Sequence, residues 1–423
     1  MMKRPVVLFS IVLILLSLAA QPAMMVTHAQ DANPALHDQI DSYLQNLAES
    51  GFSGSVLVAR DGEILLHEGY GLANDAVRQQ MTPDTIFLFG SITKQFTAAA
   101  ILHLEMQGLL DTGDRISEYL GAVPADKASI TIHQLLTHSS GLRSHVFNSD
   151  FLEIARDDAI RQILGHELLF EPGTGVSYSD DAYKILAAIV EITSGQSWQS
   201  YLEDNLFRPS AMDHTGFFND AKWEDQLVAN GYYNGQDQGS PDNWAGPYWV
   251  LIGAGGVMTT VGDMYQWYLA LQDQAVLSSE YVEKLWRPYV STGARSSFGY
   301  GWSIVETEDR GTFVETTGAG SSHNAYFHSS GDGNLVVIVA SNRIDEPWLS
   351  RLKLVENQET LYAIEVGDTL VGNIFSRDFT TLPEFAQPRA RPLRPTSLGY
   401  AAASVAAIVL LIGIWITFKR TAR

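Results

Sequence analysis

The chain has 423 residues, no cysteine, and 48 acidic against 27 basic residues, which gives a formal net charge of −21. The absence of cysteine excludes disulfides, thiol nucleophiles and thiolate zinc sites, and the acidic balance argues against nucleic acid or an anionic membrane surface as a partner. The length is sufficient for one large domain or two, with a sizeable core.

Residues 1–29 have the pattern of a secretory signal peptide. Lys3 and Arg4 precede the apolar run Val6–Ala20, and small residues lead to Ala29, after which cleavage is expected. We therefore expect the rest of the protein to act outside the cytoplasm. Residues 31–383 carry a formal charge of −28, because the two ends of the chain hold eight of the 27 basic residues and one of the 48 acidic residues.

The exported region, residues 30–380, begins with a predicted helix and a predicted hairpin. Apolar residues recur at helical spacing over Pro34–Glu49, and Gly51 follows as a stop signal. The segments Gly54–Ala59 and Glu63–Tyr70 have strand character and are joined by an Asp-Gly turn, which is a strong hairpin signal.

A serine lies one helical turn before a lysine at Ser91 and Lys94, and a strongly apolar run follows up to Gly108. Residues three apart on a helix share a face, so the Lys94 amine is expected to reach the Ser91 hydroxyl. A desolvated neutral lysine can accept the proton of a serine nucleophile. The pattern is weak evidence alone, because a second copy occurs at Ser350 and Lys353.

The rest of the exported region is mostly helical from Lys94 to about Trp286, and strand signals then return. The expected later strands are Gly299–Val305, Thr312–Thr317, Asn324–Ser329 and Asn334–Ser341, with a closing helix at Trp348–Ala363. Strands at both ends with helices between them predict an α+β fold. Its antiparallel sheet combines N- and C-terminal segments flanked by helices, and a mostly helical insertion spans about residues 110–290. A cleft at their junction is the expected binding site.

The C-terminal end has the pattern of a membrane anchor. Residues 381–397 contain four prolines and are expected to form an extended tether. Leu398–Phe418 has no charge over 21 residues, enough to cross a bilayer as a helix, and residues 419–423 would form a cytoplasmic tail. The alternative for this segment is a buried core helix. The sequence thus predicts a single-pass protein of the cell membrane with its main domain outside.

Several segments form an ordered set of motifs. They are Gly90–Lys94, Leu135–Leu142, Glu171–Gly173 with Tyr178–Asp180, Gly255–Thr260 with Asp263, Phe298–Trp302, and Thr316–Gly318. This set resembles the motifs of the serine β-lactamase and penicillin-binding-protein superfamily, in particular its branch of class C β-lactamases, D,D-peptidases and esterases. The resemblance covers about residues 35–365.

The resemblance implies a β-lactamase-like serine hydrolase. Ser91 would attack a carbonyl carbon and form an acyl-enzyme, while Lys94 and Tyr178 would share the transfer of its proton. The backbone N–H groups of Ser91 and Ala319 would bind the developing oxyanion. The residues that would contact the substrate are Asp180, Thr316, Thr317 and Gly318. No motif in the sequence indicates a metal or a cofactor.

Two residues depart from the family pattern. Asp180 stands where the family has asparagine, and its charge would favour protonated Lys94. Thr316 stands where the family has lysine or histidine, which argues against recognition of a substrate carboxylate unless the nearby His323 replaces that cation. His138 is interpreted as a structural histidine.

An aromatic group close to these motifs has two open interpretations. Trp244, Tyr248 and Trp249 could form a wall for the substrate or could only pack a long loop.

The sequence therefore favours an extracytoplasmic serine hydrolase that acts on a small-molecule or peptide ester or amide, with D-peptides or carboxylesters preferred over β-lactams. The alternative is a catalytically silent binding or regulatory protein on the same fold, suggested by Asp180 and Thr316. A true β-lactamase is a third possibility. The sequence does not determine the oligomeric state.

Overall fold

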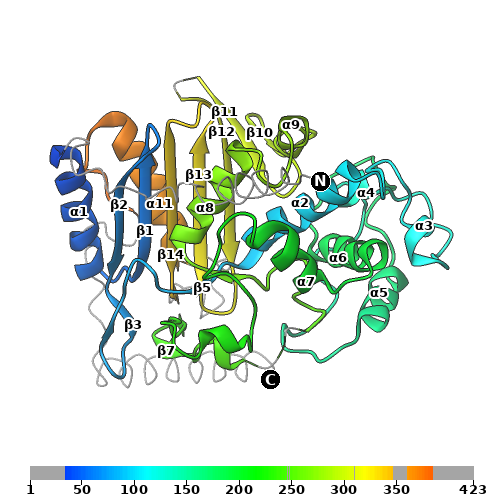
Figure 1. The fold of residues 1–423 in the computed structure, drawn as a ribbon, viewed down its shortest axis with the longest axis horizontal. Helices are drawn as coiled ribbons and strands as arrows, with labels where there is room; N and C mark the ends of the chain where they lie inside the picture. The colour runs from blue at the N-terminus through cyan, green and yellow to red at the C-terminus, as the bar shows by residue number, and fades with distance from the viewer. Residues whose placement is uncertain (1–33, 245, 247, 309, 346–359, 384–423) are drawn as a thin grey trace, which may run out of the picture.

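The computed structural model describes residues 34–244, 246, 248–308, 310–345 and 360–383. Its centre is an eight-stranded sheet in the order β2-β1-β14-β13-β12-β11-β10-β9, and every neighbouring pair is antiparallel (Figure 1). The strands are β1 (Gly54–Arg60), β2 (Glu63–Tyr70), β9 (Val290–Ser291), β10 (Ser296–Phe298), β11 (Ser303–Thr307), β12 (Gly311–Ala319), β13 (Asn324–Ser330) and β14 (Leu335–Ser341). The predicted antiparallel α+β sheet, built from both ends of the domain, is confirmed.

Helices cover both faces of this sheet. Val56 and Val58 of β1 pack with α1 (Pro34–Glu49) and α11 (Tyr362–Ser376), whereas Leu57 and Ala59 pack in the larger core with the remaining helices (Figure 1). Successive side chains of a strand point to opposite faces, so a strand covered on both sides has to be apolar at every position. This explains why β1 has no polar face.

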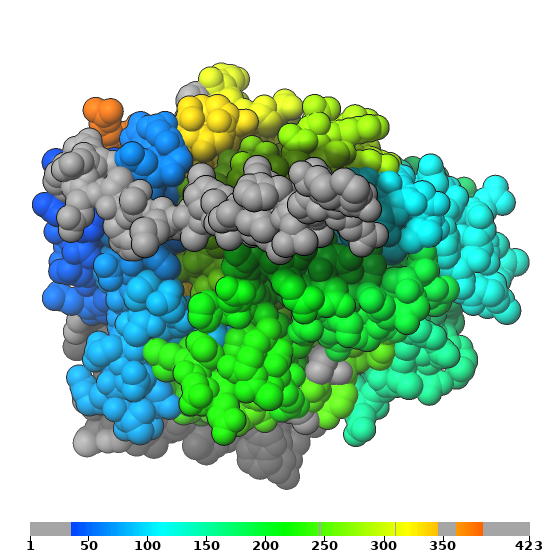
Figure 2. Space-filling model, in the orientation of Figure 1, coloured from blue at the N-terminus to red at the C-terminus, as the bar shows by residue number. Residues whose placement is uncertain are grey.

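The larger core holds the helical region and the helix that follows Ser91. Its helices are α2 (Thr93–Met106), α3 (Ser117–Leu120), α4 (Ile132–Leu136), α5 (Arg156–Gly165), α6 (Asp180–Ser194), α7 (Trp198–Leu202), α8 (Val261–Gln272) and α9 (Ser279–Leu285). Shorter helical turns are η1 (Gly90–Ile92), η2 (Glu203–Phe207), η3 (Ala221–Trp223) and η4 (Pro241–Asn243). On the face shown in Figure 2, the middle of the chain (green) lies between the N-terminal strands (blue) and the outer helices (cyan).

Three small sheets lie outside the central sheet. One contains β6 (Tyr232–Tyr233), β7 (Gln236–Asp237), β15 (Arg343–Asp345) and β16 (Thr360–Leu361); the others pair β3 (Leu72–Asn74) with β4 (Gln79–Gln80), and β5 (Phe87–Leu88) with β8 (Met258–Thr259). The β5–β8 pair matters most for the site, because β5 leads directly into η1.

Some predicted boundaries need correction. Of the closing helix predicted at Trp348–Ala363, residues 348–359 lie outside the described residues; Thr360 and Leu361 form β16, and the described helix that follows is α11, Tyr362–Ser376. The predicted strand Gly299–Val305 is wrong at its start, because β10 ends at Phe298 and β11 begins at Ser303. Gly299 and Gly301 form the turn between them, and Gly301 has φ +77°, outside the extended region.

The predicted fold class was wrong in one component, the C-terminal transmembrane helix. Within the described part of the chain, no helix has the length and apolar character needed to cross a membrane. Residues 398–418, which carried that prediction, lie outside the described residues, as do the predicted signal peptide, the predicted tail and the tether beyond residue 383.

Candidate active site

Ser91 lies in the η1 turn, two residues before α2 begins at Thr93. The Lys94 ammonium is 3.1 Å from Ser91 Oγ and donates a second hydrogen bond, of 2.9 Å, to the carbonyl of Ala254. Lys94 is almost completely buried, whereas Ser91 is half-buried. The predicted reach of the lysine to the serine is therefore present, with the serine accessible to a ligand.

The third contact of Lys94 is with Asp180, at the start of α6. The ammonium lies 2.7 Å from Asp180 Oδ1 as an ion pair. Burial lowers the pKa of Lys94, but its interactions with Tyr178 and Asp180 together raise it by more, so the net direction is upward. Burial likewise raises the pKa of Asp180, and the Lys94 charge lowers it by more. In the resting site the lysine is thus held as an ammonium.

Tyr178 lies over the same lysine, with the Lys94 nitrogen 4.8 Å from the centre of its ring. Its segment is held by the Leu135–Leu142 turn: His138 O accepts from Ser177 N at 2.9 Å, and His138 Nδ1 accepts from Ser179 N at 3.0 Å. The His138 and Tyr178 rings are 4.6 Å apart. Burial lowers the pKa of His138 to about 3, and the Lys94 charge adds to this, so the ring is neutral and acts as a brace.

Two glycines bring the two predicted oxyanion donors together. A Cβ on Gly318 would overlap the carbonyl of Phe89 and lie 3.0 Å from Ser91 N, while one on Gly90 would lie 2.8 Å from Ala319 N. Gly90 also has φ +53°, in the left-handed region. The end of β12 can therefore lie directly against η1, with Ser91 and Ala319 at the point of closest approach.

Ser91 opens on two cavities of different size. The larger, of about 400 Å³, is also lined by Lys94, Tyr178 and the end of β12, where the Thr317 side chain is exposed and Thr316 is buried. The smaller, of about 80 Å³, is lined by Asp180. The predicted substrate-binding residues are therefore divided, with Thr316, Thr317 and Gly318 on one side of the serine and Asp180 on the other.

His323 does not replace the missing cation of the third motif. Its ring is buried, Nε2 is 3.2 Å from the carbonyl of Ala229, and burial lowers its pKa to about 4. It lines neither cavity. The aromatic group is also divided: Trp244 lines the small cavity beside Asp180, whereas Tyr248 and Trp249 pack against the larger core.

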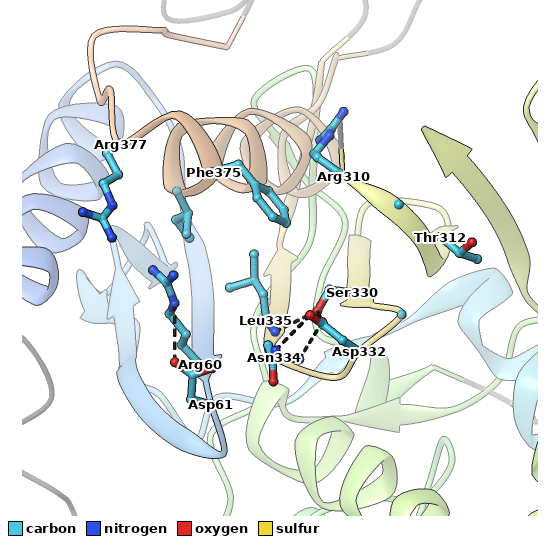
Figure 3. Close-up of a pocket in the computed structure, with 13 residues that line it drawn as sticks. Arg60, Asp61, Arg310, Thr312, Ser330, Asp332, Asn334, Leu335, Phe375 and Arg377 are labelled. Atoms are coloured by element: carbon cyan, nitrogen blue, oxygen red, sulfur yellow. Dashed lines mark hydrogen bonds and ion pairs between the residues drawn. The ribbon is translucent and has the colours of Figure 1, made fainter. Parts of the chain in front are cut away.

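A still larger cavity, of about 590 Å³, lies at the opposite end of β12 (Figure 3). Arg60 and Arg377 approach it from one side and Arg310 from the other, and Phe375 projects toward the turn between β13 and β14. Its described lining contains no paired nucleophile and base, and Asp332 is already bound by Ser330 Oγ at 2.6 Å. The predicted nucleophile and its lysine therefore line the cavity of Ser91 and not this one.

Several contributors to the site carry no recognisable signal in the sequence. Ala254 contributes only its backbone carbonyl, and Leu361 of β16 and Ile364 of α11 line the cavity from far along the chain. Next to Asp180 in the chain, Asp181 forms a fully buried ion pair of 2.8 Å with Lys184. The only sign of this pair in the sequence is that its two residues are three apart on a helix. Across the described residues, no group of three or more histidine, aspartate or glutamate side chains is arranged to hold a metal ion.

Comparison with known proteins adds independent information. The chain matches the Beta-lactamase family over residues 40–357. PbpX of Bacillus subtilis (strain 168), placed by its name among the penicillin-binding proteins, is 32% identical over 306 residues, covering 72% of this chain and 74% of that protein. Penicillin-binding protein 4* of the same organism is 28% identical and covers 72% of each chain. The octameric penicillin-binding protein homologue from Pyrococcus abyssi has a TM-score of 0.64 at 26% identity, covering 72% of this chain and 73% of that chain.

Proposed function

Because this chain belongs to the Beta-lactamase family, as its motifs predicted, we propose that it is a serine hydrolase in which Ser91 forms an acyl-enzyme with an ester or amide. One observation carries the proposal: a buried amine, that of Lys94, lies 3.1 Å from the hydroxyl of an accessible serine beside a pair of backbone donors. Few arrangements other than nucleophilic catalysis bring these groups together.

In the proposed reaction, Ser91 Oγ forms a bond to the carbonyl carbon and its proton passes to the pair formed by Lys94 and Tyr178. The oxyanion is bound by the N–H groups of Ser91 and Ala319. Collapse of this intermediate breaks the bond to the leaving group, which receives the proton. Water then attacks the acyl-enzyme, and the same groups return the proton to Ser91.

The charges around Ser91 favour a carboxylester, or a D-peptide that has no free carboxylate beside the scissile bond, over a β-lactam. A β-lactam or a peptide with a free C-terminus presents a carboxylate near the scissile bond. The third motif offers Thr316 in place of a cation, and the Asp180 carboxylate repels a second anion. The predicted signal peptide places this activity outside the cytoplasm.

The test is the intact mass of the purified protein after exposure to a fluorophosphonate. We expect one stoichiometric adduct, which is absent in Ser91→Ala. Hydrolysis of a panel of esters and D-peptides is expected to be lost in the same variant while its circular dichroism is retained. Retained hydrolysis in Ser91→Ala would exclude the proposal.

The second candidate function is a catalytically silent binding protein, favoured by one observation, the ion pair that keeps Lys94 protonated. It predicts a folded protein that gives no adduct. Recovery of labelling in Asp180→Asn would then identify the ion pair as the cause of the inactivity.

A further inference from the structure

The cavity of Ser91 passes across the edge of β12 to the opposite face of the sheet. β11 pairs with β12 only as far as Glu315, which lies opposite Ser303, so residues 316–319 have no partner strand on that side among the described residues. Thr317 pairs with Tyr326 of β13, which packs in the cluster of α11. Residues directly opposite each other share a face of the sheet. The exposed Thr317 side chain therefore points toward α11, away from the helices around Lys94.

Two aliphatic side chains line this cavity from the junction of β16 and α11: Leu361, the last residue of β16, and Ile364, in the first turn of α11. The turn is fixed to the sheet by two hydrogen bonds: Ala363 N donates to Asn324 Oδ1 at 2.6 Å, and Tyr362 donates to Asp345 at 2.7 Å. Gly367, one turn later, packs so closely on Tyr326 that a Cβ would overlap its ring. A wall held in this way can select a ligand by shape and polarity.

The described lining contains no arginine, aspartate or glutamate. Lys94 is its one lysine, and the Lys94 ammonium already contacts Ser91, Ala254 and Asp180. A carboxylate that entered would lose its hydration without gaining a cation to pair with, which is costly, whereas a hydrocarbon chain would gain by leaving water.

We infer that Ile364 in the first turn of α11, together with Leu361 at the end of β16, selects substrates whose group beside Ser91 is uncharged and ends in a hydrocarbon chain. The inference rests on the proposed function, because it names the substrate class of the same site. It adds a residue that lies outside the family motifs and on the opposite face of the sheet from the nucleophile.

The experiment compares two pairs of esters that differ only at one chain end. In the first pair, p-nitrophenyl hexanoate is matched with the mono-p-nitrophenyl ester of hexanedioate, so a methyl group is replaced by a carboxylate on the acyl side. In the second, hexyl acetate is matched with 6-acetoxyhexanoate, which places the carboxylate on the alcohol side. For at least one pair we expect kcat/KM to be more than tenfold higher for the neutral ester.

Ile364→Lys places an ammonium at the end of the cavity. In this variant the ratio of kcat/KM for the neutral ester to kcat/KM for the charged ester is expected to fall close to one or below it. The matched control is Ile192→Lys, which makes the same change at an exposed isoleucine of α6 that lies outside both cavities of Ser91; its ratio should equal that of the wild type. Ile364→Ala provides a second measurement that adds no charge. It enlarges the cavity, so the chain length that gives the highest kcat/KM should increase.

The outcomes separate this inference from the proposed function. A wild type that takes up no fluorophosphonate and cleaves no ester contradicts the proposed function itself. A wild type that labels at Ser91 but has equal ratios in both pairs overturns the inference alone. So does an Ile364→Lys variant that labels and keeps the ratio of the wild type. If that variant does not fold, an unchanged chain-length optimum in Ile364→Ala overturns it.

Discussion

The Lys94 ammonium lies 2.7 Å from the Asp180 carboxylate, so that this ion pair joins the larger cavity of Ser91, lined by Lys94, to the smaller one, lined by Asp180. Asparagine at this position would leave the lysine without a fixed negative charge. The ion pair therefore stabilises the protonated lysine at the step where a neutral amine is needed.

The first prediction concerns the pH dependence of Asp180→Asn. Removal of the carboxylate removes a group that raises the pKa of Lys94, so the neutral amine becomes available at lower pH. The inflection of the fluorophosphonate labelling rate against pH should move downward, and labelling at pH 7 should rise severalfold. Asp150→Asn, at another carboxylate of the small cavity, should move the inflection less. An inflection that rises in Asp180→Asn would contradict this account.

The second prediction concerns the contact between η1 and β12. Gly90→Ala places a Cβ 2.6 Å from the carbonyl oxygen of Ala319, so the two oxyanion donors must separate. Loss of one such donor costs about a hundredfold in rate, and labelling should fall by about that factor. Gly108→Ala is the control: its φ of +72° is equally left-handed, but nothing lies within 4 Å of its Cβ. It should lose some stability and keep its labelling rate.

The third prediction concerns acid stability through His328. Its ring packs against Phe313 at 4.7 Å, and neither of its nitrogens has a hydrogen-bond partner within the described chain. Burial lowers the pKa of His328 to about 4, and the charge of Arg310 adds to this, whereas an unfolded histidine has a pKa of about 6.5. The unfolded state therefore binds a proton first, and stability is lost as the pH falls below about 6.5.

Between pH 7 and pH 5 this one residue should account for about 2 kcal/mol of lost stability, measured by urea denaturation. His328→Phe should remove that part of the pH dependence. His166→Phe, at an exposed histidine, should leave the dependence of the free energy of unfolding on pH as it is in the wild type. If the free energy of unfolding of His328→Phe depends on pH as it does in the wild type, His328 is not the source of this loss of stability.

The fourth prediction concerns the ion pair of Asp181 and Lys184, both of which are fully buried. Lys184→Met leaves the Asp181 carboxylate without its partner, which should reduce the free energy of unfolding by about 3–5 kcal/mol. The double variant Asp181→Leu with Lys184→Met buries no charge and should recover a large part of that loss. Equal stability of the single and double variants would show that the pair does not stabilise the fold in this way.

Local signals predicted the N-terminal part of the fold well. The helix Pro34–Glu49 has the predicted bounds, and β1 and β2 match the predicted strands to within one residue, because a glycine stop signal and a tight turn fix their ends. The pairing of Ser91 with Lys94 was equally local. Their chemical roles, like that of Tyr178, remain predictions.

Contacts that depend on distant segments could not be predicted in this way. Gly367 and Gly372 lower the helix propensity of the segment that forms α11, and no helix was predicted there beyond Ala363. The fold needs Gly367 because Tyr326 packs against it, and no local pattern indicates that contact. The approach of Gly318 to Phe89, and the place of Ile364 at the end of the cavity, likewise follow from how the sheet is assembled.

The strand order has a consequence for biosynthesis. β1 pairs with β14 from Gly54, opposite Ser341, to Arg60, opposite Leu335, so one edge of β1 has no partner until almost the whole domain has been translated. At 5–20 residues per second, roughly tens of seconds separate the two strands. During that time the nascent chain exposes an apolar strand edge, which makes it prone to aggregation and dependent on chaperones. A nonsense mutation upstream of codon 335 is therefore expected to yield no partly active fragment.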